Sequence, residues 1–185
     1  MAQPAVDLNQ LRGLVLRNQA NDANLPLPQS EKVLVDREGA IRLGSQTSPA
    51  ENRRLSEVHQ GTFSSNTRFE RDHGIAVYKL PRNARPVTVS NIPGHLYTIC
   101  SELRDRYEMF LYHDGNLYQV LVRFPNVAGR YGVHDAHLFS DGRICFGPAG
   151  GMSSFEQAFS KSVLWASGFS IFTRTGRFPF SKNNV

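Results

Sequence analysis

The sequence predicts an α+β protein, because segments with helical spacing of apolar residues occur together with runs typical of antiparallel strands. Residues 108–124 give the strongest signal: two apolar runs flank the turn residues Asp114, Gly115 and Asn116, which is the pattern of a β-hairpin. After Ser153 and Ser154, which can cap a helix, apolar residues recur at helical spacing. The expected buried stripe of this helix is Phe155, Phe159, Val163, Ala166 and Phe169 or Ser170.

Between residue 71 and the hairpin, the runs 74–80 and 86–91 predict two strands. Residues 95–107 predict an amphipathic helix, with Cys100 facing the core. The residues that would share one face of it are Leu96, Cys100, Leu103 and Tyr107.

The first 70 residues are predicted to form an N-terminal extension, with the main domain at 71–185. Residues 6–19 have helical spacing, and two short apolar runs around Glu38 and Gly39 indicate a hairpin. Residues 45–71 are polar and rich in turn-forming types, so we expect a linker or mobile loop there. The domain boundary is therefore placed near residue 70.

Composition argues against several classes of protein. The net charge of +5 comes from scattered basic residues, so nucleic acid is not an expected partner. There is neither an apolar run of about 18 residues nor a secretory signal, which predicts a cytoplasmic protein without a membrane segment. The two cysteines form no CxxC pair, and Gly147–Gly151 lacks the Gly-Lys-Ser/Thr ending of a phosphate loop. Neither a metal nor a cofactor is therefore predicted.

Cys145 is the principal candidate for chemistry. It follows the turn Ser140–Gly142 in a loop, where a thiol can act as a nucleophile. His134 and His137 lie close in sequence and could supply a base or a hydrogen-bond donor. A buried, inert Cys145 with surface histidines is an equally good interpretation of the spacing, since free cysteines are often buried.

Two segments resemble the ubiquitin-conjugating (UBC-like) family, in its prokaryotic branch. The first is VLVRFP followed by VHDAHLFSDGRICF, in which a strand ending in Phe-Pro leads to a His, a Gly and a Cys. The second is SVLWASGFSIFTRTGRFPF, similar to a Trp-bearing helix that runs into a Thr-Gly-aromatic-Pro pattern. The resemblance covers roughly residues 115 to 180.

The resemblance implies a helix, a four-stranded antiparallel meander, an active-site loop and C-terminal helices, with residues 71–185 as the catalytic domain. It implies that Cys145 forms a thioester, that Gly142 shapes the turn and that His137 takes the place of the motif histidine, which mostly orients the loop. The strands not supplied by the 108–124 hairpin would come from 74–80 and 86–91.

One departure from the family concerns its His-Pro-Asn triplet, because residues 134–138 contain neither the proline nor the asparagine. The group that would stabilise a tetrahedral intermediate is therefore left open. Candidates are Asp135, Asp141 and backbone N–H groups near Gly147. Either carboxylate could also assist deprotonation of an acceptor amine, although Asp141 before Gly142 is typical of a turn residue.

By the same resemblance, the partners would be a ubiquitin-like modifier and an adenylating activating enzyme, and such systems can include a metalloprotease that removes the modifier. Bacterial systems of this kind are commonly linked to defence against phage. Two alternatives stay open from sequence. One is an inactive UBC-like domain that binds a ubiquitin-like protein, and the other is a hydrolase with Cys145 and His134 or His137 as a dyad.

Overall fold

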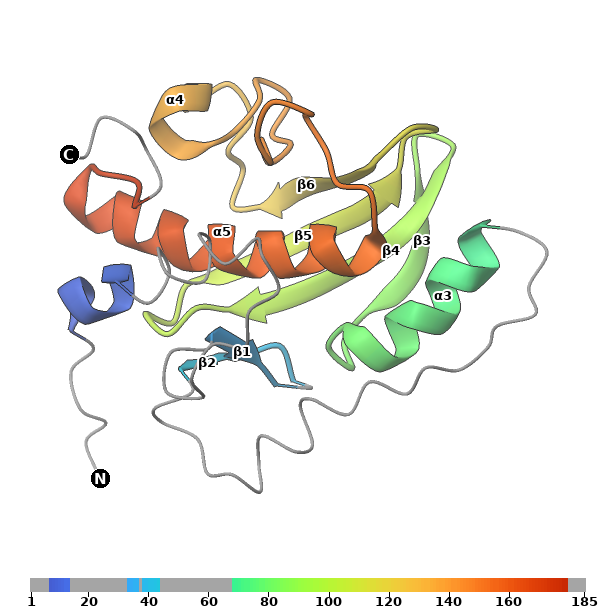
Figure 1. The fold of residues 1–185 in the computed structure, drawn as a ribbon, viewed down its shortest axis with the longest axis horizontal. Coiled ribbons are helices and arrows are strands. Elements are labelled where there is room, and N and C mark those ends of the chain that lie inside the picture. Colours follow the sequence, from blue (N-terminus) through green and yellow to red (C-terminus); the bar gives the residue numbers. More distant parts are fainter. Residues whose placement is uncertain (1–6, 14–32, 37, 44–67, 180–185) are drawn as a thin grey trace.

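The computed structural model describes residues 7–13, 33–36, 38–43 and 68–179 of the 185-residue chain. Its centre is a four-stranded antiparallel meander in the order β3-β4-β5-β6. The strands are β3 (Arg85–Val89), β4 (Ile92–Cys100), β5 (Arg106–His113) and β6 (Tyr118–Phe124). The long helix α5 (Phe155–Thr175) crosses one face of this sheet, and α3 (Arg68–Lys79) lies beside it (Figure 1). The predicted α+β class is confirmed.

The hairpin predicted over 108–124 is confirmed as β5 and β6. Tyr118, Val120 and Val122 of β6 are buried at alternate positions, whereas Phe124, two residues further on, is 50% exposed. Asp114 holds the turn, because its carboxylate accepts hydrogen bonds from the backbone N–H groups of Asn116 and Leu117, both at 2.9 Å.

The strand predicted at 74–80 is wrong, because these residues belong to helix α3. Asp72 and Ala76 are buried one helical turn apart, and Leu80 is buried one turn further on. The apolar run alone looks like a strand. Its helical repeat becomes visible only when residues 68–73 are included, of which 68–71 were expected to belong to the linker.

The helix predicted at 95–107 is also wrong. Residues 92–100 form β4, in which His95, Tyr97 and Ile99 are buried with the period of two that a strand requires. Residues 94–100 pair with residues 106–112 of β5, so tertiary pairing overrides the fortuitous helical spacing. Cys100 consequently lies on the face opposite to Tyr97 and Ile99, half-buried, and not in a helical core stripe.

The strand predicted at 86–91 is confirmed as β3, which pairs with β4 from Arg85↔Leu96 to Val89↔Ile92. Together the four strands form the meander that the resemblance requires. They do so, however, with β4 in place of the expected helix and without a strand at 74–80.

The hairpin predicted around Glu38 and Gly39 is confirmed as β1 (Val33–Val35) and β2 (Ile41–Leu43). The backbone N–H of Cys100 donates to the Gly39 carbonyl at 2.7 Å, and Ile41 is part of the hydrophobic core. Residues 8–13 are helical, as predicted, with Leu11 buried. The rest of the 6–19 helix and residues 45–67 of the linker lie outside the described residues. The division at residue 70 stays a prediction, and residue 70 lies in the first turn of α3.

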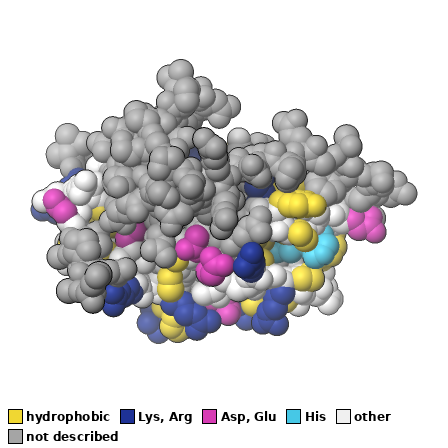
Figure 2. Space-filling view, turned by 90° about the horizontal axis from the view of Figure 1, so that it is seen from below, with side chains coloured by type: hydrophobic (Ala, Val, Ile, Leu, Met, Phe, Trp, Pro, Cys, Tyr) yellow, Lys and Arg dark blue, Asp and Glu magenta, His cyan; other side chains and the backbone are white. Residues whose placement is uncertain are grey.

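Basic and acidic side chains share the face that Figure 2 shows. In the view from below, Lys and Arg side chains lie in separate places with Asp and Glu side chains near them (Figure 2). Several are paired, as in Arg174 with Asp105 at 2.5 Å and Arg82 with Glu38 at 3.5 Å. That nucleic acid is not the partner stays a prediction.

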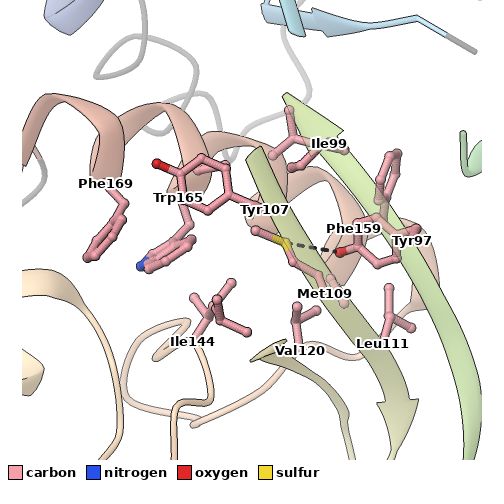
Figure 3. Close-up of a cluster of buried hydrophobic side chains, with 14 of the residues drawn as sticks. Tyr97, Ile99, Tyr107, Met109, Leu111, Val120, Ile144, Phe159, Trp165 and Phe169 are labelled. Atoms are coloured by element: carbon pink, nitrogen blue, oxygen red, sulfur yellow. Dashed lines mark hydrogen bonds between the residues drawn. The ribbon is translucent and has the colours of Figure 1, made fainter. Parts of the chain in front are cut away.

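The predicted C-terminal helix is confirmed as α5, and every residue of its expected stripe is buried. Ser154 caps it by accepting a hydrogen bond from the Gln157 N–H at 3.2 Å, and Gly176 ends it at a left-handed φ of 70°. Figure 3 shows Trp165 and Phe169 of this helix beside Tyr107 of the sheet. Two buried tyrosine–serine hydrogen bonds of 2.6 Å, Tyr97–Ser162 and Tyr107–Ser170, fix the helix on the sheet. Phe180 lies outside the described residues.

Within the described segments, no helix is long and apolar enough to cross a membrane.

Candidate active site around Cys145

The segment that carries Cys145 is attached to the edge of the sheet by main-chain hydrogen bonds. After β6 the chain passes through the one-turn helix α4 (Val133–Ala136) and returns along β6. The Val122 N–H donates to the Gly142 carbonyl at 3.1 Å, and the Ile144 N–H donates to the Val120 carbonyl at 2.9 Å. Residues 142–144 thereby extend the sheet beyond β6 by a short fourth pairing, directly before the cysteine.

The same segment closes on itself as a small hairpin. Leu138 pairs with Ile144, and both side chains are buried. The turn depends on Gly142, whose φ of 88° favours glycine and whose N–H donates to the Phe139 carbonyl at 2.9 Å. At the open end, the Cys145 N–H donates to the His137 carbonyl at 2.8 Å. The backbone position of Cys145 is thus determined from two sides.

The Cys145 side chain is half-buried, and it lines a cavity of about 80 Å³. Its Sγ donates to the Gly147 carbonyl at 3.9 Å, a weak contact. The volume suffices for two or three waters or a small acyl group. The residues lining this Cys145 cavity are His137, Ile144, Cys145, Phe146, Gly147, Lys161 and Trp165.

His137 and His134 have different places relative to the thiol. His137 ends α4 in the left-handed region, with a φ of 51°, and its ring lies 5.0 Å from the ring of Phe178. It lines the Cys145 cavity, and its carbonyl accepts the Cys145 N–H. His134 is exposed on α4 and is not part of the cavity wall. Of the two histidines, the structure therefore brings only His137 to Cys145.

The two carboxylate candidates also lie outside the cavity wall. Asp141 accepts the Arg143 N–H at 3.0 Å and pairs with the Arg143 guanidinium at 2.6 Å, so its contacts stabilise the turn. Asp135 is exposed in α4. Gly147 presents its carbonyl oxygen to the sulfur, whereas the sequence-based candidate was a backbone N–H there.

Trp165 connects helix α5 with the segment that leads to Cys145. Its indole N–H donates to the Ala136 carbonyl at 2.9 Å, one residue before His137. The Trp165 ring is buried against Phe169, so it also anchors the core. Trp165 lines the Cys145 cavity together with Lys161, one helical turn earlier, and neither position was inferred from the sequence. The i, i+4 spacing of Lys161 and Trp165 was the available signal.

A second group of titratable side chains joins α3 to the sheet. His73 Nδ1 and His95 Nε2 share a hydrogen bond of 3.2 Å, and the Tyr118 hydroxyl donates to Asp72 at 2.8 Å. His95 is buried, and desolvation followed by the nearby His73 lowers its pKa to about 4. Desolvation by burial raises the pKa of the Asp72 carboxyl above its ordinary value. Arg68, Asp72, His95 and His113 line a cavity of about 220 Å³.

No group of three or more His, Cys, Asp or Glu side chains that could hold a metal ion occurs in the segments that the structure describes. Comparison with known proteins gives no match: no family model, no curated protein and no solved structure matches the chain.

Proposed function

We propose that this chain is a UBC-like conjugating enzyme of bacterial type, which accepts a ubiquitin-like protein as a thioester on Cys145 and passes it to an amine. The observation that carries the proposal is the position of Cys145. It is half-buried beside a small cavity, at the end of a short hairpin that continues a four-stranded antiparallel meander, ahead of a long helix packed on the sheet. The sequence motifs around it resemble the same family.

The chemistry requires no metal and no redox step. The Cys145 thiolate attacks the carbonyl carbon of a thioester on the activating enzyme, and the thiolate of that enzyme leaves. In the second step an amine attacks the same carbon, loses a proton, and Cys145 leaves as thiolate. Both steps pass through a tetrahedral intermediate, so the site must admit an acyl group. The Cys145 cavity is large enough for one.

The hydrolase alternative is less well supported. A cysteine–histidine dyad needs a hydrogen bond between sulfur and imidazole. Among the described residues, Cys145 Sγ bonds to the Gly147 carbonyl, and the His137 ring packs on Phe178. Whether the chain is an enzyme or an inactive binding domain is decided by testing for a thioester adduct on Cys145.

As proposed partners, we retain a ubiquitin-like modifier, an adenylating activating enzyme and a metalloprotease, in a cytoplasmic system for defence against phage.

The test is incubation of the chain with ATP and with the adenylating enzyme and ubiquitin-like protein encoded in the same genome. The wild-type chain should form an adduct that a thiol reductant removes. Cys145→Ala should form none, and Cys145→Ser should form an ester that the reductant leaves intact. Cys100→Ala is the matched control, since Cys100 is also half-buried, and it should behave as wild type.

An adduct that persists in Cys145→Ala and disappears in Cys100→Ala would overturn the assignment of the nucleophile. Stable binding of the modifier, with no adduct in any variant, would favour the inactive binding domain.

A further inference from the structure

Lys161 on helix α5 is a cationic side chain beside Cys145 that the sequence did not single out. It is half-buried and lines the Cys145 cavity. Lys79 and Lys161 are the lysines among the described residues, and Lys79 lies in the last turn of α3 and outside this cavity.

The placement of Lys161 relative to Cys145 is determined by a continuous set of contacts. Lys161 precedes Trp165 by one helical turn, so both side chains leave the same side of α5. The Trp165 indole N–H binds the Ala136 carbonyl, and the next residue, His137, accepts the Cys145 N–H. Helix α5 and the cysteine hairpin therefore hold Lys161 and Cys145 on walls of one cavity.

Acyl transfer at Cys145 places a negative charge on the carbonyl oxygen of the tetrahedral intermediate, and a donor or cation must face that oxygen. Several other groups near Cys145 are poorly suited. The Trp165 N–H and the Cys145 N–H are already bonded to carbonyls, and Gly147 turns its own carbonyl oxygen to the sulfur. Asp135 and Asp141 carry the wrong charge for this task.

We propose that the Lys161 ammonium stabilises the oxyanion formed during acyl transfer at Cys145, in the place of the family's missing asparagine. The inference rests on the proposed function, and it assigns the group that the sequence left open. A cation in a small, partly closed cavity acts more strongly than in bulk water, because less solvent screens it. It would act in loading and in discharge alike, since both steps form the same kind of intermediate.

The test uses a small synthetic thioester, acetyl-glycyl-glycine joined to 2-mercaptoethanesulfonate, so that no partner protein is needed. The Cys145 thiolate displaces the mercaptoethanesulfonate thiolate, and intact mass follows the acylated protein. Hydroxylamine then discharges it, giving the hydroxamate and free Cys145. We expect Lys161→Met to slow both steps by about 100-fold, the lower end for loss of an oxyanion donor. Lys161→Arg, which keeps the charge, should recover most of the rate, and Lys79→Met should match wild type.

Thermal unfolding of each variant separates this role from a structural one: Lys161→Met should slow acyl transfer without a matching loss of Tm. Equal rates for Lys161→Met and wild type would overturn the inference while leaving the proposed function intact. So would a reductant-stable acyl group mapped to Lys161, which would make it an acceptor. If the wild-type Cys145 is not acylated at all, the proposed function itself fails.

Discussion

At the scale of single residues, main-chain contacts hold the backbone of Cys145 in place. The carbonyl of His137 and the turn at Gly142 hold the segment, and neither contact uses a side chain. The His137 side chain can therefore be replaced without breaking these contacts, provided that the replacement tolerates the backbone conformation. This separates positioning roles from chemical ones in the two predictions that follow.

His137→Asn should keep acylation of Cys145 within about threefold of wild type. Asparagine is one of the few residues that readily adopts the left-handed φ of 51° found here, and the carbonyl that binds the Cys145 N–H is retained. The synthetic thioester assay measures the rate. A loss of 100-fold or more, within the range for removal of a general acid or base, would mean that the imidazole itself handles protons.

Gly142→Ala should slow the same acylation by about tenfold or more, because a small displacement of a reacting group is costly. The added methyl has ordinary room, 3.6 Å from Ala128 and Leu121, so the cost of about 1–2 kcal/mol comes from the φ of 88°. Gly150→Ala is the matched control, with a φ of 75° and open space around it. Both variants should lose similar stability in urea. Equal acylation rates would show that the turn does not position Cys145.

At the scale of elements, helix α5 is joined to the segment that leads to Cys145 through Trp165, the only tryptophan of the chain. Trp165→Phe should cost about 1–2 kcal/mol, because it leaves the Ala136 carbonyl without this donor. Urea unfolding followed by circular dichroism measures the loss. Tyr107→Phe removes a comparable buried hydrogen bond, to Ser170, and neither of these two residues lines the Cys145 cavity. Only Trp165→Phe should also slow acylation; a similar effect of both would contradict the link between α5 and the loop.

The elements that were predictable are those whose signal is local. The β5–β6 hairpin has its turn chemistry at Asp114, and α5 has a capping serine and a long stripe, so neighbours in sequence suffice. The residues of β4 happen to repeat at helical spacing, and only their pairing with β5 makes them a strand. Helix α3 was missed because its buried side includes a polar residue, Asp72, so the apolar residues alone do not show the helical repeat.

In the candidate site too, the residues with a local sequence signal were predictable, and those placed by tertiary packing were not. Cys145 and the turn at Gly142 could be inferred from the motif, and His137 from its closeness in sequence. The spacing of Lys161 and Trp165 puts both on one side of α5, but it does not place that side at the cavity, because Lys161 reaches the cavity only through the packing of α5 on the loop, 16 residues after the cysteine in the sequence. The local role of Asp141 is clear once its pairing with Arg143 is seen.

At the scale of the whole molecule, the attachment of α3 to the sheet should make stability depend on pH. The folded pKa of His95, about 4, lies below the ordinary value of 6.5, so between these values the unfolded chain binds the extra proton. This contribution is complete above about pH 6.5 and is lost as pH falls towards 4. From pH 7 to 4.5 it amounts to about 2 kcal/mol.

His95→Phe isolates this contribution, since it removes the titrating group and keeps a ring among Phe69, His73 and Phe155. The raised pKa of Asp72 acts in the opposite direction, and it is present in both proteins. Urea unfolding at pH 7 and 4.5 should therefore show a loss about 2 kcal/mol larger for wild type than for His95→Phe. Equal losses would contradict the assignment to His95.

The central claim is that the sulfur of Cys145 accepts an acyl group from another protein. The most direct measurement is the attachment point of the modifier in Cys145→Ser, determined by mass spectrometry of peptides after the ATP-dependent reaction. We predict an ester on the serine at position 145, cleaved by hydroxide and resistant to reductant. A modifier attached at any other residue, or none attached while the wild-type chain is charged through Cys100, would contradict the claim.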